Sequence, residues 1–464
     1  MTLKTLSASI WFFVLAASTA GAEPPNFVVL YADDAGYADF GFQPSVREEM
    51  KHLTPNIDSL ARDGARFSQF YMTADTCSPS RAGIMTGRYQ QRFGHDHNLP
   101  PGCPKGLPRT ETFGADRLHA LGYETALVGK WHLGYPKAYQ PNPRGFDWFY
   151  GLLQGSRPYY PQDKISADRA IQVNGRRTPE TGYVTDRLGD AACRFIKEHQ
   201  NDPFFLFVSF TAPHGPLQPR KSDAARIAHI KEGQRRDYAG LVVALDDNVG
   251  KILAALKEAG LDDKTLVVFT NDNGGSLKNG ANNSPLRGGK GSWWEGGFRV
   301  PMAMRWPGKI PPGSVLADPV ISLDLLPTFI AAAGGVVQPE WNLDGVNLVP
   351  AITVQQDRLP ERTLYWRRWN GGSPVTVIRE GRWRLVYGKD PARQAPALYD
   401  IEADVGETRN LAAQYPDRVR AMRAKGEAWQ KDFPGPLWRR SGAKGEETDD
   451  GDEVAGAGDT QVHH

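Results

Sequence analysis

Short apolar runs alternate along much of the chain with longer segments in which apolar residues recur at helical spacing. Four of the runs have the length and composition of buried strands. They are residues 26–31, 123–128, 204–210 and 265–270. Leu241, Leu245, Val249 and Ile252 share one face of a core-packing helix that is expected to end at Gly260. Strands separated by helices predict an α/β fold.

The pattern changes from about residue 348 onward. Short alternating strands are predicted at residues 363–366, 376–379, 383–387 and 397–400, followed by a helix over 417–429. We therefore expect a large domain over residues 23–347 and a smaller antiparallel sheet with a helix over 348–440. Residues 441–464 are rich in Asp, Glu and Gly without a core-forming pattern, and predict a disordered acidic tail.

Residues 1–22 have the pattern of a secretory signal peptide. Lys4 supplies a positive charge, residues 10–17 are apolar, and Ala20-Gly21-Ala22 forms a small-residue cleavage site. The apolar run is too short for a membrane span, although a retained anchor is the alternative. We expect a mature chain without a membrane span, located in the periplasm or secreted.

The net charge bears on possible binding partners, and the cysteine content on possible disulfides. Lys and Arg number 55 and Asp and Glu number 53, a formal net charge of +2, which gives no support for nucleic-acid or anionic-membrane binding. The chain has three cysteines, Cys77, Cys103 and Cys193. Cys193 is expected to be a buried free thiol. The alternative is a Cys103–Cys193 disulfide, which an oxidising compartment would allow.

Polar residues follow each of the four predicted strands, where a strand would leave the sheet. They are Asp33 and Asp34, Lys130 and His132, His214, and Asp272 and Asn273. Taken singly, each set has a plain interpretation as a solvated loop or a structural histidine. Because ligands of open α/β sheets bind beyond the carboxyl ends of the strands, four such ends together predict one site.

The segment 77–88, Cys-Ser-Pro-Ser-Arg-Ala-Gly-Ile-Met-Thr-Gly-Arg, predicts a short helix with Cys77 at its mouth. Ser78 is a good N-cap, Pro79 fits the first helical position, and Gly87 fits the position just past the end. Free N–H groups at such a mouth can hold an anion, and Arg81 lies one turn further on. A nucleophile, an anion seat and a guanidinium indicate attack on a sulfate or phosphate ester. A structural cysteine before a surface helix is the alternative.

Cys-Ser-Pro-Ser-Arg followed by Ile-Met-Thr-Gly-Arg resembles the maturation motif of the type I, formylglycine-dependent sulfatases of the alkaline phosphatase-like superfamily. The resemblance extends from about Pro25 to the region of Phe433. It implies a large mixed sheet sandwiched by helices. It also implies that a formylglycine-generating or sulfatase-maturating enzyme oxidises Cys77 to formylglycine, an aldehyde whose hydrate supplies the attacking oxygen.

The resemblance also implies roles for the residues at the strand ends. Asp33, Asp34, Asp272 and Asn273 match metal ligands, and their hard oxygen donors favour Ca²⁺ or Mg²⁺, with Ca²⁺ usual in the family. Lys130, Lys290 and Arg81 match groups that bind sulfate, Arg81 also holding the hydrate. With Lys290, His214 matches the group that protonates the leaving oxygen. His132 matches the base that releases sulfate.

Only a few features of the sequence indicate the substrate. His95, His97 and Asn98 closely follow the motif helix and are expected to line a sugar pocket. Residues 142–147, Asn-Pro-Arg-Gly-Phe-Asp, resemble carbohydrate-acting members of the family, so the expected substrate is a sulfated polysaccharide or its oligosaccharides. For the aromatic residues 159, 160, 293, 294, 366 and 369, ordinary packing is favoured over sugar stacking.

Two further functions remain open at this point. One is a phosphonate or phosphodiester hydrolase of the same fold. The other is an unmatured chain that binds sulfated glycans without turning them over.

Overall fold

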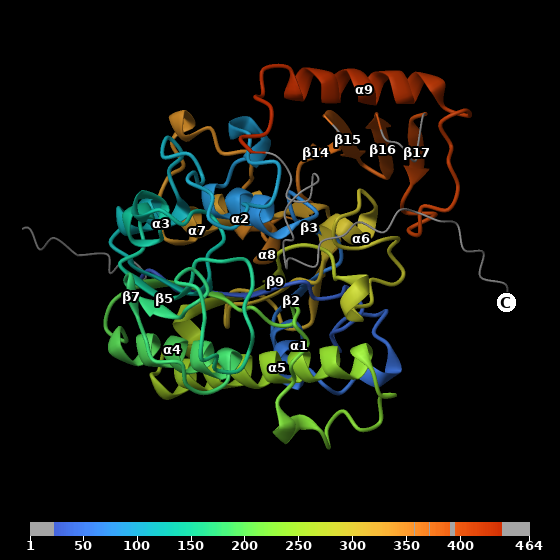
Figure 1. Cartoon of the computed structure of the whole chain (residues 1–464). Helices are drawn as coiled ribbons and strands as arrows, with labels where there is room; N and C mark the ends of the chain where they lie inside the picture. Colours follow the sequence, from blue (N-terminus) through green and yellow to red (C-terminus); the bar gives the residue numbers. More distant parts are fainter. Residues whose placement is uncertain (1–22, 357, 371, 390–394, 439–464) are drawn as a thin grey trace, which may run out of the picture.

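The structure of the protein is a computed structural model that describes residues 23–356, 358–370, 372–389 and 395–438 (Figure 1). The predicted signal peptide and the tail beyond residue 440 lie outside these residues. No helix within the described ranges is long and apolar enough to cross a membrane.

A ten-stranded mixed sheet forms the centre, in the order β12-β2-β11-β9-β1-β8-β4-β5-β6-β7. Its strands are β1 (Asn26–Ala32), β2 (Ala65–Phe67), β4 (Glu124–Lys130), β5 (Trp148–Leu152), β6 (Gln172–Val173), β7 (Arg176–Arg177), β8 (Phe204–Ser209), β9 (Thr265–Asn271), β11 (Ala303–Arg305) and β12 (Ser314–Leu316). The inner strands β9, β1, β8, β4 and β5 are parallel, with Val28 opposite both Leu206 and Val267. Parallel strands are buried on both faces, which explains the uninterrupted apolar runs.

Helices cover both faces of this sheet (Figure 1). The α-helices are α1 (Pro55–Arg62), α2 (Cys77–Thr86), α3 (Gly114–His119), α4 (Val184–Glu198), α5 (Gln234–Glu258), α6 (Glu295–Phe298), α7 (Leu325–Ala332), α8 (Val349–Ile352) and α9 (Pro416–Gln430). Val28 and Leu30 of β1 share one core cluster with α1, α4 and α5, whereas Phe27 and Val29 share another with α2, α3 and α7. The alternation along one strand therefore builds two cores, one on each face.

A small three-stranded sheet, β10 (Arg299–Val300), β3 (Phe70–Tyr71) and β13 (Val320–Ile321), lies beside the large one. The predicted C-terminal antiparallel sheet is confirmed, in the order β14-β15-β16-β17. Its strands are β14 (Thr363–Asn370), β15 (Ser373–Glu380), β16 (Trp383–Gly388) and β17 (Ala397–Asp400). Helix α9 covers its outer side in Figure 1.

Candidate active site

The four predicted strand ends meet at one edge of the large sheet. Asp33 and Asp34 follow β1, His214 lies in the loop after β8, and Cys77 begins α2. One ligand atom from each of these four residues lies within 4.8 Å of the others. Lys130 is the last residue of β4, so the strand itself, rather than a turn beyond it, delivers this ammonium group.

Three buried ion pairs lie in the site. The pairs and their N···O distances are Lys130–Asp33 at 2.8 Å, Lys290–Asp34 at 3.0 Å and Arg81–Asp272 at 2.9 Å. All six side chains are at most 8% exposed. Charges buried to this degree are costly unless they are paired, so the three cations and three carboxylates compensate one another.

Arg81 is held on several sides. Its Nη1 donates to the carbonyl oxygen of Lys130 at 3.1 Å and to Ser209 Oγ at 2.5 Å, and its guanidinium carbon lies 5.2 Å from the centre of the Tyr31 ring. Its Nε is buried without a hydrogen-bond partner. One donor of a fixed guanidinium is therefore left for a group that enters the site.

The mouth of α2 differs from the sequence-based expectation. The helix begins at Cys77 with Thr76 as N-cap, so the predicted N-cap Ser78 lies inside the first turn. The Ser78 N–H donates to Asn98 Oδ1 at 3.0 Å, and the Ser80 N–H to the Thr76 carbonyl at 3.3 Å. Pro79 has no N–H. Most of the backbone N–H groups that were expected to bind an anion therefore already have partners or are absent. The attraction for an anion comes instead from the side-chain cations.

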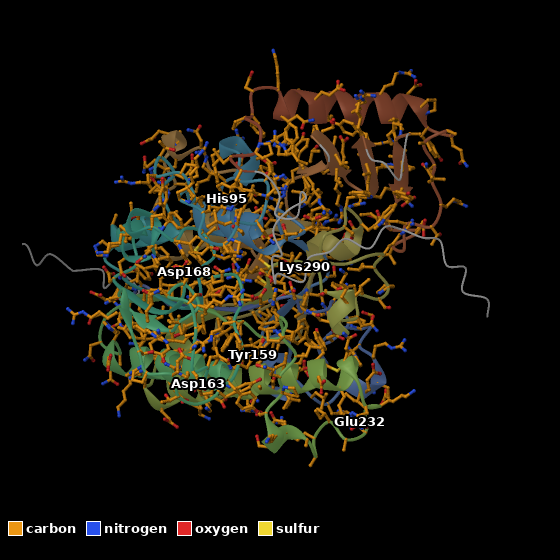
Figure 2. The ribbon with its side chains drawn as sticks, in the orientation of Figure 1. His95, Tyr159, Asp163, Asp168, Glu232 and Lys290 are labelled. Atoms are coloured by element: carbon orange, nitrogen blue, oxygen red, sulfur yellow. The ribbon has the colours of Figure 1, made fainter. Side chains whose placement is uncertain are left out.

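His214 faces the Lys290–Asp34 pair. Its Nε2 lies 3.3 Å from Lys290 Nζ and 3.5 Å from Asp34 Oδ2. Its Nδ1 lies 2.7 Å from the Gly215 carbonyl oxygen, which can only accept, so Nδ1 carries the proton. The hydroxyl of buried Tyr159, which is labelled below Lys290 in Figure 2, is 2.8 Å from the carbonyl oxygens of both Thr211 and His214 and so fixes this loop.

His132 is buried with a left-handed φ of 59°. Burial, followed by the charges of Lys130 and Arg81, lowers its pKa far below the ordinary value, so the imidazole is neutral. Its Nε2 lies 3.3 Å from the Leu99 carbonyl oxygen and therefore carries the proton, while Nδ1 has no partner. The unpartnered Nδ1 is a free proton acceptor. A Cβ on Gly155 would lie 2.6 Å from His132 Cε1, so this glycine leaves room for the ring.

His95, His97 and Asn98 lie behind the start of α2. His95 is fully buried, and its Nε2 is 2.7 Å from Ser78 Oγ, which donates to the His132 carbonyl at 2.8 Å. Burial lowers the pKa of His95 to about 3. The backbone carbonyls of His97 and Asn98 accept from Trp438 Nε1. For His95 and Asn98 these contacts favour supporting the helix over touching a sugar.

The acidic residues fit a hard divalent cation. Asp272 Oδ1 accepts from the Asp34 N–H at 3.2 Å, and the Asp33 and Asp272 carboxyl groups are within hydrogen-bonding reach. Burial and the Asp272 charge raise the pKa of Asp33 to about 6. The Oδ1 of Asn273 is buried without a partner. Crowded carboxylates and an unused amide oxygen are the donors that Ca²⁺ and Mg²⁺ bind.

The C-terminal sheet reaches this site through β14, a contact that the sequence analysis missed. Arg368 Nη1 donates to Asp75 Oδ2 at 2.8 Å and to the carbonyl oxygen of Gly291. The Gly291 N–H in turn donates to the Asp75 carbonyl at 2.9 Å. Asp75 lies two residues before Cys77, and Gly291 directly follows Lys290, so one arginine joins the two segments.

Other sequence-based candidates lie elsewhere. The three cysteines are free, which leaves the Cys103–Cys193 disulfide unformed. Trp366 is a core residue of the C-terminal sheet, as expected for packing. Arg144, in the segment 142–147, donates to the carbonyl oxygens of Leu107, Pro108 and Glu111, so it fixes a loop.

A buried cysteine, three buried cations and a cluster of carboxylates at the carboxyl edge of a helix-covered mixed sheet are the groups expected of a hydrolase of anionic esters with the alkaline phosphatase-like fold. Residues 25–336 match the family model described as Sulfatase, and residues 290–428 match N-sulphoglucosamine sulphohydrolase, C-terminal. The chain belongs to the sulfatase family, a class of sulfuric ester hydrolases, and this confirms the resemblance found in the sequence.

Individual relatives agree with this assignment. Arylsulfatase J of Mus musculus is 34% identical over 80% of this chain, which spans 62% of that protein's length. N-acetylgalactosamine-6-sulfatase of Sus scrofa is 34% identical over 78% of this chain and 73% of its own. The crystal structure of Ps i-CgsB in complex with k-i-k-neocarrahexaose has a TM-score of 0.84 and 39% identity, covering 90% of this chain and 95% of that chain.

Proposed function

We propose that this protein is an exported sulfatase that hydrolyses sulfate esters of a carbohydrate through a formylglycine made from Cys77. The position of that side chain carries the proposal. Cys77 Sγ lies 3.7 Å from Asp33 Oδ1 and 4.0 Å from Asp34 Oδ1, in a site that also holds Arg81, Lys130 and Lys290. Burial raises the pKa of the Cys77 thiol well above its usual range, so the unmodified thiol is a poor nucleophile.

The proposed roles follow from the contacts. One hydroxyl of the hydrated aldehyde gives its proton to the neighbouring Asp33 carboxylate and attacks sulfur, and the S–O bond to the sugar breaks. His214, beside Lys290, supplies the proton for the leaving sugar oxygen, a contribution of about a hundred- to ten-thousand-fold. His132 Nδ1 then accepts the proton of the second hydroxyl, sulfate leaves, and the aldehyde forms again.

The cations of the site stabilise the charge on the sulfuryl oxygens. Lys130, Lys290 and Arg81 are already held in place, so little reorganisation is needed when charge develops. Asp33, Asp34, Asp272 and Asn273 would hold the metal, for which we propose Ca²⁺. When bound, it supplies Lewis-acid polarisation of a sulfate oxygen.

The proposal of a carbohydrate substrate rests on the relatives. One relative is named N-acetylgalactosamine-6-sulfatase, and the structure of Ps i-CgsB was solved with k-i-k-neocarrahexaose. Export rests on the pattern of residues 1–22. We propose periplasmic or secreted polysaccharide degradation, with a maturation enzyme as the partner that converts Cys77.

Mass spectrometry of the active protein tests the proposal. Trypsin releases residues 67–81 as one peptide containing Cys77. We expect its mass to be about 18 Da below that of the thiol form, since SH and one hydrogen are exchanged for a carbonyl oxygen. Turnover should require this conversion and should rise on co-expression with a formylglycine-generating enzyme. An ordinary thiol in fully active material would contradict the proposal.

Matched sulfate and phosphate monoesters of one aryl alcohol test the choice of ester. We expect a higher kcat/KM for the sulfate. A clear preference for phosphate would instead favour the phosphohydrolase alternative.

A further inference from the structure

We propose that a cleft beside Lys290 and His214 is a second subsite, which binds another anionic sugar residue of the same glycan. This rests on the proposed function. The cleft has a volume of about 410 Å³ and is formed by three segments. They are the turn around Arg47 and Glu49, the start of α5 at Arg235, and the loop from Leu277 to Gly288.

The loop that lines the cleft leads directly into the catalytic site. Gly288 lines the cleft and lies two residues before Lys290. A Cβ on Gly289 would be 3.2 Å from Leu277 Cγ, so the residue before Lys290 packs against a residue that lines the cleft. On the other side, a Cβ on Gly215, next to His214, would be 3.3 Å from Asn279 Nδ2.

The burial of the catalytic atoms explains why a second subsite is needed. Cys77 is 1% exposed and the His214 side chain 18%, so only a small part of the catalytic site faces solvent. The remaining sugars of a chain must lie over neighbouring surface. A cleft of this size falls in the range of small-ligand sites, about 300–1,000 Å³.

The charges of the cleft favour an anion. The charged lining residues are two arginines, Arg47 and Arg235, and one carboxylate, Glu49. Arg235 is shared between Glu49 at 3.1 Å and the buried Asp39 at 2.8 Å, so Arg47 is the cation left to bind a ligand. Arg47 is exposed, and its guanidinium makes no hydrogen bond or ion pair within the described part of the chain. A guanidinium presents paired N–H donors that match the oxygens of sulfate or carboxylate.

The rest of the lining suits a sugar ring. Asn282 uses its Oδ1 to accept from the Ser284 N–H at 2.8 Å, while its amide nitrogen has no partner among the described residues. Leu277 is 57% exposed and offers an apolar surface to a pyranose face. Asn283 is instead committed to the loop, since its Oδ1 accepts from Tyr37 N–H and Gly275 N–H.

Binding to a protein that cannot turn over tests the subsite without relying on catalysis. The Cys77→Ser chain would be titrated by calorimetry with two probes, k-i-k-neocarrahexaose and a chondroitin 6-sulfate hexasaccharide, each with its desulfated form. We expect Arg47→Met to weaken binding of at least one sulfated probe about tenfold, a loss equal to one good charged contact. Binding of the desulfated forms should not change, and Arg47→Lys should recover part of the affinity.

Kinetics supply the second measurement. In the otherwise unmodified enzyme, Arg47→Met should raise KM about tenfold for the better sulfated oligosaccharide, with kcat little changed. Both constants for 4-nitrocatechol sulfate, which is too small to reach the cleft, should stay unchanged. Arg176→Met is the matched control, because Arg176 is exposed on β7 at the far end of the sheet.

Equal affinity of the Arg47→Met and parent chains for both sulfated probes would overturn the subsite. So would an absence of binding to either probe, or an equal loss with the desulfated forms. A failure of the proposed function has a different signature, namely an intact thiol in active protein or no hydrolysis of 4-nitrocatechol sulfate.

Discussion

Two buried networks of basic and acidic side chains lie within this protein. They differ in the polar atoms that they leave without hydrogen-bond partners. One is the catalytic site. The other joins the C-terminal sheet to the segment around α6. It consists of Arg299, Arg379, Arg384, Glu295, Glu407 and Tyr71.

The network at α6 is closed except at one atom: among its described residues, only Glu295 Oε1 is buried without a hydrogen bond, and it still lies within ion-pair distance of Arg384. Glu407 Oε2 accepts from the Glu295 N–H at 2.7 Å, and its Oε1 pairs with Arg384. Glu295 Oε1 lies 3.2 Å from Arg384 Nε, and its Oε2 accepts from the Tyr71 hydroxyl at 2.8 Å. The catalytic network instead leaves Arg81 Nε, His132 Nδ1 and Asn273 Oδ1 without partners. Buried charge alone therefore does not identify a site. The α6 network leaves one carboxylate oxygen without a hydrogen bond, whereas the catalytic network leaves a donor, an acceptor nitrogen and an amide oxygen, which are the kinds of group that bind a substrate or a metal.

The largest expected effect is at the nucleophile. Cys77→Ser should lower kcat by at least about 10⁴-fold, because a serine hydroxyl can accept the sulfuryl group but has no second hydroxyl with which to release it. Thermal unfolding should be unchanged. Cys193→Ser is the matched control and should keep full activity. Normal turnover of Cys77→Ser would remove that residue from the site.

Opening the closed network should affect stability instead. Arg384→Met leaves Glu295 and Glu407 buried without their shared partner, and should lower the free energy of unfolding by about 3–5 kcal/mol. Chemical denaturation measures this change. At low temperature, where the variant is still folded, kcat for 4-nitrocatechol sulfate should lie within about twofold of the parent value. A large loss of kcat in fully folded protein would show that the two networks are not separable.

Removal of one catalytic cation should reduce turnover without unfolding the chain. Lys130→Met removes a charge that we propose to face the sulfate, and we expect kcat to fall by about 10²–10³-fold. The comparison is with Lys264→Met, an exposed lysine paired with Glu23, which should have no effect on kcat. Equal activities of the two variants would assign Lys130 a structural role.

A smaller effect is expected where the backbone makes room for His132. Gly155→Ala places a methyl group 2.6 Å from the ring, which must move, and we expect kcat to fall about tenfold with KM nearly constant. Gly406→Ala is a suitable control, since its nearest neighbour would be an ordinary contact at 3.6 Å. An unchanged kcat in Gly155→Ala would show that the ring position is not critical.

The smallest effect concerns the pH dependence of stability. Burial raises the pKa of Glu407 to about 7 against the opposing charge of Arg384, while the Glu295 charge acts in the same direction as burial. The folded state then binds this proton more tightly than the unfolded state. Its contribution to stability is complete below about pH 4.5 and is lost as the pH rises toward 7. Glu407→Gln should flatten this slope in denaturation curves measured from pH 4.5 to 7, and an unchanged slope would contradict the assignment.

The sequence predicted the parts of the site that follow from local pattern. Residues 26–31 and 265–270 are buried parallel strands, and this is why Asp33 and Asp272 meet. The sequence did not predict that the Asn98 side chain accepts a hydrogen bond from the Ser78 N–H, because a side chain twenty residues away leaves no local signal. The contact between Arg368 and Asp75 spans 293 residues and was missed for the same reason. Pairing across such separations depends on how the domains pack, and no periodicity encodes it.

The bridge made by Arg368 limits how the protein can be shortened or recombined. The same guanidinium touches the approach to Cys77 and the residue after Lys290, so these two reactive positions are aligned from outside the large sheet. A chimera that exchanged the small C-terminal unit for that of another protein would have to bring an equivalent guanidinium with it. A version cut before β14 would lose the side chain that ties the segment before Cys77 to the segment after Lys290.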